Sequence, residues 1–169
     1  ISIKGYQLSK KEKKLLANEK PWGLILFKRN IKSFKQIKKL IQKIKKLTKE
    51  PKFPIMIDEE GASVSRLSKI IDNNFSQKFL GDIYKINNKV GLNFYKNYIN
   101  NLANFLRRIG VNINTVPVLD VLRDNTSKII GNRSFSDDPD VVRMLGKVCV
   151  KQYELNKLAT VIKHVPGHG

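Results

Sequence analysis

The sequence predicts an α/β fold built on a parallel sheet, because short apolar runs alternate with segments of helical periodicity. Parallel neighbours need right-handed crossovers, so the sheet is either doubly wound or closed into a barrel. No Gly-rich phosphate fingerprint follows any of the apolar runs, which argues against a dinucleotide-binding fold. The strand-like runs cover residues 22–27, 53–57, 111–119 and 159–163.

The first third of the chain is expected to hold strands and one amphipathic helix. Residues 1–4 are interpreted as a remnant of one more strand. The run at 22–27 lacks polar alternation, which is typical of a strand covered on both faces. Apolar residues over 34–47 recur at spacings that place them on one helical stripe. Ser33 is the expected N-cap of this helix, and Pro51 ends the segment.

Two further helical segments follow. Residues 83–109 read as one helical region with a polar face, and Gly110 has the position of a C-terminal cap. Asp138 and Pro139 open the next helix, since proline is favoured in the first turn. The single cysteine, Cys149, falls in this helix and cannot form an internal disulfide. We expect a buried structural thiol.

Composition indicates a globular protein, since 41% of the 169 residues are hydrophobic. We expect residues 1–169 to form a single domain, truncated at its C-terminal end. No run approaches the roughly 18 apolar residues of a membrane span, and no signal-peptide pattern opens the chain. A cytoplasmic protein without membrane contact is expected. The net charge of +19 is spread over helix faces with few aromatic residues between the lysines, so nucleic acid is not an expected partner.

Polar residues that follow the strands are the candidates for a site, because parallel α/β folds bind ligands at the carboxyl ends of their strands. Asp58, Glu59 and Glu60 follow the second apolar run. Consecutive residues at a strand end alternate in direction, so at most one or two of these carboxylates can face a common site. Paired carboxylates are typical of glycosidases, but a solvated acidic turn is an equally good interpretation.

The loop over residues 121–138 is longer than the about 2 to 6 residues usual for such connections. Long loops at this end of a parallel sheet often carry function. Arg133 lies in this loop. Its guanidinium group could bind a hydroxylated substrate or pair with a carboxylate such as Asp58, and the sequence leaves both open.

Both histidines of the chain, His164 and His168, lie close to Lys163 near the C-terminus. Their spacing would suit zinc-binding histidines on a helix, but Pro166 and Gly167 lie between them and exclude that helix. No metal site is therefore expected. Hydrogen bonding to a polar ligand is the better interpretation of the pair, and a capped loop is the alternative.

Five short motifs, taken in order, resemble glycoside hydrolase family 3, specifically its β-N-acetylhexosaminidases. The last of them, KHVPGHG at residues 163–169, is close to the KHFPGHG form of that subgroup and is highly specific. The others are weak individually and strong in this order and spacing. They are GLILFKRN at 23–30, IDEEG at 57–61, NINTVPVLD at 112–120 and IGNRSF at 130–135.

The resemblance implies a TIM (β/α)8-type barrel, of which this chain would hold about five of the eight strands, counting residues 1–4 as the first. It also implies a carbohydrate substrate with a terminal N-acetylglucosamine, held in the −1 subsite through its hydroxyls. Arg66 matches an arginine of the family motif and, like His168, either contacts the substrate or shapes a loop. The substrate-binding residues implied by the resemblance are Asp58, Arg133, Lys163 and His164.

The family mechanism is retaining and proceeds through a glycosyl-enzyme intermediate. The resemblance places the nucleophilic aspartate and the acid/base histidine beyond residue 169, so no catalytic residue is expected within this chain. A protein ending here would be inactive. Neither a metal nor an organic cofactor is implied. The full-length enzyme is expected to be a monomer that acts on cell wall muropeptide fragments in peptidoglycan recycling.

Two departures from the family pattern are visible. The family usually has Gly-Gly-Arg after the acidic pair, whereas Gly61 is followed here by Ala62 and Ser63, which puts fine specificity in doubt. Val165 replaces the phenylalanine of KHFPGHG and should pack similarly. An exo-β-glucosidase of the same family is the nearest alternative, although the Gly-His-Gly ending favours the hexosaminidase. A non-catalytic carbohydrate-binding protein is the other alternative, if the chain truly ends here.

Overall fold

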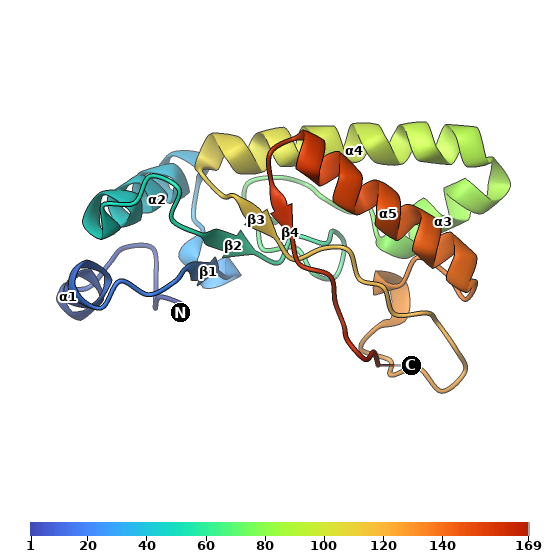
Figure 1. The fold of residues 1–169 in the computed structure, drawn as a ribbon, viewed down its shortest axis with the longest axis horizontal. Helices are drawn as coiled ribbons and strands as arrows, with labels where there is room; N and C mark the ends of the chain where they lie inside the picture. Colours follow the sequence, from blue (N-terminus) through green and yellow to red (C-terminus); the bar gives the residue numbers. More distant parts are fainter. Residues whose placement is uncertain (169) are drawn as a thin grey trace.

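The computed structural model describes residues 1–168 and contains a parallel sheet with the strand order β1-β2-β3-β4 (Figure 1). The strands are β1 (Leu24–Leu26), β2 (Ile55–Ile57), β3 (Ile113–Asn114) and β4 (Ala159–Thr160). Each strand pairs with the next one along the chain, which is the order of a barrel, whereas a doubly wound sheet reverses its order at a switch point. The α/β class is confirmed, and the sheet is an arc of a TIM-type barrel.

The prediction of a strand at residues 1–4 is wrong, so the arc has four strands rather than five. Ile1 nevertheless lies beside β1, because its carbonyl accepts a hydrogen bond from the Ile25 N–H at 2.9 Å. Its amino group donates to the Gly23 carbonyl at 3.1 Å. The chain then turns away, and these contacts do not continue into a ladder.

The helices are α1 (Lys10–Asn18), α2 (Phe34–Thr48), α3 (Gln77–Ile86), α4 (Asn88–Ile109) and α5 (Pro139–Leu155), with short 3-10 turns η1 (Lys28–Asn30) and η2 (Gly131–Arg133). The predicted N-cap of α2 is confirmed, since the Ser33 side chain accepts from the Gln36 N–H. Gly110 ends α4 in the left-handed conformation, as predicted. Pro139 opens α5.

Two helical features differ from the prediction. The single helical region expected at 83–109 is divided, because Asn87 ends α3 and its side chain also caps α4 by accepting from the Val90 N–H. Helix α1 was not predicted. It begins with a capping box formed by Ser9 and Glu12, a signal that the sequence does contain.

Helices α2, α4 and α5 lie on the same face of the sheet (Figure 1). Alternate strand residues point into this layer, and Leu24, Leu26, Ile55 and Ile57 are at most 1% exposed. Ile25, between two of them, is only half-buried. Within the described residues, the prediction that the first strand is covered on both faces is therefore wrong, because only the side chains on its helix-facing side are fully buried.

Cys149 is buried in α5, as predicted, and burial raises the pKa of its thiol to about 12. Among residues 1–168, no helix is both long and apolar enough to cross a membrane. The last residue of the KHVPGHG motif, Gly169, lies outside the described part of the chain.

Candidate functional site

The predicted site residues meet at the carboxyl ends of β2, β3 and β4. Asp58 and Glu60 follow β2 directly, and Lys163 follows β4. Lys163 is held beside the segment after β3 by two backbone hydrogen bonds, from the Leu119 N–H to its carbonyl at 2.6 Å and from its N–H to the Pro117 carbonyl at 3.2 Å. Side chains far apart in the sequence thereby share one edge of the sheet.

The carboxylate of Asp58 contacts three side chains. Its Oδ2 atom lies 3.0 Å from Nη2 of Arg66, its Oδ1 atom accepts from the Thr115 hydroxyl, and Nζ of Lys163 lies 3.6 Å from Oδ1. Burial opposes ionisation of this carboxyl, but the hydrogen bonds from Thr115 and Arg66 and the nearby cations outweigh it and lower the pKa of Asp58. An ionised acceptor, with its side chain 18% exposed, therefore faces the site.

Glu60 connects Lys163 with a third cation of the site, Arg133. Its side chain is only 2% exposed and lies 2.6 Å from Nζ of Lys163. Arg133 forks onto the same carboxylate, with Nε 2.8 Å from Oε2 and Nη2 3.0 Å from Oε1. The hydrogen bond to Glu60 raises the pKa of Arg133. Of the two sequence interpretations of Arg133, the structure shows carboxylate pairing, with Glu60 rather than Asp58 as the partner.

Glu59 points the other way and organises the loop that follows β2. Its Oε2 atom accepts from the backbone N–H groups of Arg66 and Leu67 at 2.8 and 3.0 Å. Its Oε1 atom accepts from the Asn73 amide at 2.7 Å. Burial raises the pKa of Glu59. The prediction that at most two of the three consecutive carboxylates face one site is confirmed, because only Asp58 and Glu60 do.

His164 and Asp120 form the second part of the site. Nδ1 of His164 lies 2.6 Å from Oδ2 of Asp120, whose side chain is fully buried. Burial opposes ionisation of Asp120, but its hydrogen bonds to His164 and to the His168 N–H outweigh it and lower the pKa of this carboxyl. Because Nδ1 is engaged, Nε2 is the ring nitrogen that can meet a ligand. A hollow of about 580 Å³ opens beside this pair, lined also by Arg123.

His168 contacts the site through its backbone and its ring. Its N–H donates to Oδ1 of Asp120 at 2.7 Å. Its ring packs edge-on against that of His164, with centroids 4.6 Å apart. No group of three or more His, Cys, Asp or Glu side chains suited to a metal ion occurs among the described residues.

Arg66 lies in the same loop as Ala62 and Ser63, the two residues at which this sequence departs from the pattern of the family it resembles. The loop after β2 places Gly61 and Ala62 at positive φ, +101° and +46°. Ala62 therefore adopts a conformation that favours glycine. The turn brings Arg66 back onto Asp58, so a basic group contacts this carboxylate although Ser63 stands where the family has arginine. The buried Nε of Arg66 has no hydrogen-bond partner within the part of the chain described here.

Sequence reasoning assigned no site role to Glu60 or Asp120, although each contacts one of the predicted site residues. The spacing of Glu60 two residues after Asp58 puts both on one side of the strand end, which is a usable signal. No comparable local signal identifies Asp120 as the partner of His164.

Comparison with known proteins agrees with this geometry. Residues 1–169 match the family described as Glycosyl hydrolase family 3 N terminal domain. A Beta-hexosaminidase of Hydrogenovibrio crunogenus is 34% identical over 169 residues, which cover 100% of this chain and 47% of that protein. A Beta-hexosaminidase of Bordetella avium is 35% identical over 173 residues, which cover 100% of this chain and 48% of that protein.

The fold comparison gives the same family. NagZ from Neisseria gonorrhoeae, solved in complex with N-trifluoroacetyl-D-glucosamine, superposes with a TM-score of 0.89 at 31% identity, covering 99% of this chain and 50% of that chain. The chain thus spans about half the length of the relatives it matches. It belongs to glycosyl hydrolase family 3, because residues 1–169 match the N-terminal domain of that family.

Proposed function

We propose that the protein is a retaining glycoside hydrolase that removes terminal β-linked N-acetylglucosamine. Its family membership supports the assignment of glycosidase activity. The similar proteins from Hydrogenovibrio and Bordetella carry the name Beta-hexosaminidase. The similar NagZ structure holds an N-acylated glucosamine derivative. Within such an enzyme, this chain supplies half of the barrel and the subsite for the terminal sugar.

One observation carries this proposal. The residues implied by the resemblance to bind sugar are Asp58, Arg133, Lys163 and His164. They lie at one edge of the sheet although they come from three separate segments of the sequence. Sugar hydroxyls both donate and accept hydrogen bonds. The ionised Asp58 offers acceptor oxygens, whereas Lys163 and Arg133 offer donors. Such a set can fix the ring orientation of a hydroxylated ligand.

The chemical step needs groups that this chain does not supply. We expect an aspartate on a later strand to attack the anomeric carbon while a loop histidine protonates the departing glycosidic oxygen. Water, deprotonated by that histidine, then cleaves the glycosyl-enzyme ester and releases the sugar. The part played by residues 1–168 is positioning, because a fixed sugar ring keeps its anomeric carbon within reach of the nucleophile.

The natural substrate that we propose is a cell wall muropeptide fragment, processed in the cytoplasm during peptidoglycan recycling by a monomeric enzyme. Neither a metal nor an organic cofactor enters this mechanism. The resemblance of the KHVPGHG motif to the hexosaminidase subgroup is the support for this choice over the glucosidases of the family.

The test is release of a chromogenic aglycone by the full-length gene product. The β-N-acetylglucosaminide should be cleaved in clear preference to the β-glucoside. A preference for the glucoside would instead establish an exo-β-glucosidase. Folded protein that turns over neither compound would leave a carbohydrate-binding role, which direct titration with N-acetylglucosamine would measure.

Variants link the activity to this site. His164→Ala should lower kcat/KM for the acetylated substrate about 10- to 100-fold, the loss expected when a buried polar group of the substrate is left without its hydrogen-bond partner. Arg133→Ala should have an effect of similar size. Arg143→Ala is the matched control, because Arg143 also pairs with a carboxylate but lies on the outer face of α5, with its side chain 61% exposed. Equal losses in the two arginine variants would contradict the assignment.

A further inference from the structure

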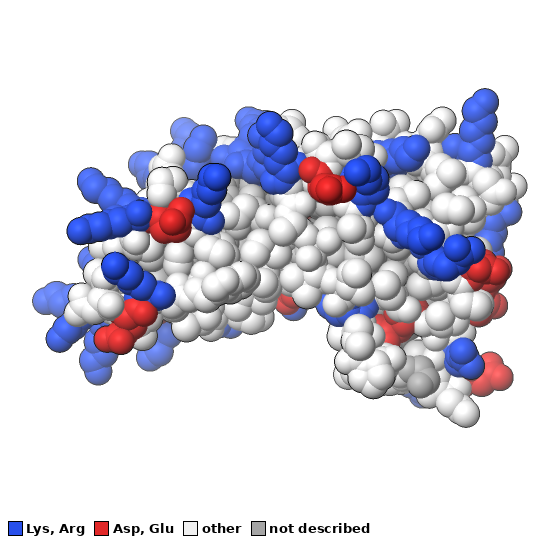
Figure 2. Space-filling view, viewed as in Figure 1, with Lys and Arg blue, Asp and Glu red and all other residues white. Residues whose placement is uncertain are grey.

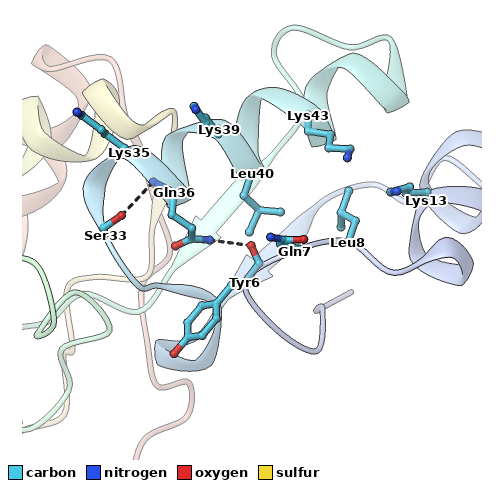
Figure 3. Close-up of a pocket in the computed structure, with 10 residues that line it drawn as sticks. All are labelled: Tyr6, Gln7, Leu8, Lys13, Ser33, Lys35, Gln36, Lys39, Leu40 and Lys43. Carbon is cyan, nitrogen blue, oxygen red and sulfur yellow. Dashed lines mark hydrogen bonds between the residues drawn. The ribbon is translucent and has the colours of Figure 1, made fainter.

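A groove lies between α2 and the segment that leads into α1 (Figure 3). Its volume is about 560 Å³, within the range of small-molecule sites. The segment that precedes α1 contributes Leu8, which is 7% exposed, and α2 contributes Leu40, which is 5% exposed. These two buried side chains give the groove an apolar floor.

The rim of the groove is cationic. Lys13 lines it from α1, and Lys35, Lys39 and Lys43 line it from α2. In Figure 3 the side chains of Lys35 and Lys39 point outward from the rim. No acidic side chain lines the groove. Within residues 1–168, none of these four lysines takes part in an ion pair. The groove therefore offers uncompensated positive charge from two helices.

Helix α2 cannot neutralise these lysines itself. Its sequence, FKQIKKLIQKIKKLT, contains no aspartate or glutamate. Lys35, Lys39 and Lys43 follow one another at a spacing of four residues, so they form a row of like charges along one side of the helix. Successive members are about 6 Å apart along the axis. Figure 2 shows that Lys and Arg predominate over the end of the molecule formed by α1 and α2.

Hydrogen bonds from Gln36 fix the polar end of the groove. Nε2 of Gln36 donates to the Tyr6 carbonyl at 2.8 Å and to the Asn30 carbonyl at 3.1 Å. These bonds tie the segment before α1 to the first turn of α2. The ring of Tyr6 points away from the lysines (Figure 3), and its hydroxyl accepts from Lys69 at 3.0 Å. The groove therefore has cationic donors but no aromatic platform.

We propose that this groove binds a short linear oligophosphate. A row of lysines at regular spacing suits a chain of phosphate groups, each of which carries negative charge and acceptor oxygens. The lack of a stacking ring argues against the bases of single-stranded nucleic acid. A concave site of this volume is also too small for a duplex and is not shaped for a flat bilayer. The binding is separate from the sugar site and does not depend on the proposed hydrolase activity.

The test is calorimetric titration of the full-length protein with tripolyphosphate at low salt, comparing two double variants. Lys39→Gln with Lys43→Gln should weaken binding about tenfold, because each lost contact charge changes affinity several-fold even in a water-like dielectric. Lys38→Gln with Lys46→Gln removes the same charge from exposed positions of the same helix outside the groove, and should weaken binding less than about threefold.

Three results would overturn the proposal. Equal weakening by the two double variants would show diffuse attraction to a lysine-rich surface. Citrate binding as tightly as tripolyphosphate would show that phosphate is not recognised. Stronger binding of a single-stranded oligonucleotide or of anionic lipid vesicles, lost in the groove variant, would assign the groove to that class of partner. Matching circular dichroism spectra of both variants verify that each is folded.

Discussion

Glu60→Gln tests the ion network that holds the site together. The carboxylate of Glu60 is 2% exposed and contacts Lys163 at 2.6 Å and Arg133 at 2.8 and 3.0 Å. Glutamine has the same shape but keeps only one acceptor oxygen, so its amide nitrogen must face one of the two cations. Either the Lys163 contact or the Arg133 fork is lost.

The expected cost follows from these contacts. A hydrogen bond to a charged group contributes about 1.5–3 kcal/mol, and removing one partner of a buried ion pair costs about 3–5 kcal/mol. Lys163 and Arg133 are each 15% exposed, so water can partly solvate the cation that loses its partner. We therefore expect Glu60→Gln to lower the free energy of unfolding by about 2–4 kcal/mol.

Two assays separate the effect of Glu60→Gln on stability from its effect on the placement of Lys163 and Arg133. Urea unfolding of the full-length protein measures the free energy of unfolding. For the second, KM for the chromogenic β-N-acetylglucosaminide should rise more than kcat falls, because Lys163 and Arg133 lose their orientation toward the sugar. Glu154→Gln is the control, since its pair with Lys151 is 68% exposed on the carboxylate side and should contribute less than about 0.5 kcal/mol. A stability change in Glu60→Gln no larger than in this control, with KM unaltered, would refute the network.

Three other predictions concern backbone strain, acid stability and the open edge of the sheet. Ala62→Gly should raise the free energy of unfolding by about 0.5–1 kcal/mol, because it relieves a left-handed alanine at the cost of some unfolded-state entropy. Gly61→Ala should lower it by at least about 2 kcal/mol in the same urea experiment, since the new methyl would lie 2.1 Å from the Phe75 carbonyl oxygen. Asp120 has a lowered pKa when folded, so it stabilises the protein above its ordinary pKa of 3.8 and this stabilisation disappears as the pH falls through the folded value. Asp120→Asn should therefore flatten the acid side of the stability profile, and an unchanged profile would contradict the assignment. Residues 1–169 expressed alone should elute as aggregates from a sizing column, because the edge at β4 is open; a monomer with cooperative unfolding would disprove this.

Local sequence patterns were sufficient to predict most of the elements. Helix α2 follows from its apolar stripe and the Ser33 cap, and the end of α4 follows from Gly110, because these signals act within a turn or two of the chain. The break at Asn87 was not predicted. The helical spacing of apolar residues continues across Asn87, whereas the helical conformation of the backbone is interrupted there. The extra strand at residues 1–4 failed because an apolar run is necessary but not sufficient for pairing.

The site, like the fold, could be predicted from the sequence only in part. That polar groups gather at one edge follows from the sequence alone, because parallel strands carry their carboxyl ends to the same side. The motif order was enough to suggest the family, and the comparison bears it out.

Which side chain meets which was decided only by the tertiary structure. Arg133 pairs with Glu60 across a sequence separation of 73, and His164 pairs with Asp120 across 44. The sequence does not distinguish the partners of neighbouring carboxylates such as Asp58 and Glu60. Their partners depend on strand register and on the path of the loop before Arg133, which fix distances to within an ångström. Periodicity and spacing along the chain contain no information about distances of an ångström. The sequence therefore determined which residues the site contains, and the fold determined which of them form hydrogen bonds and ion pairs with one another.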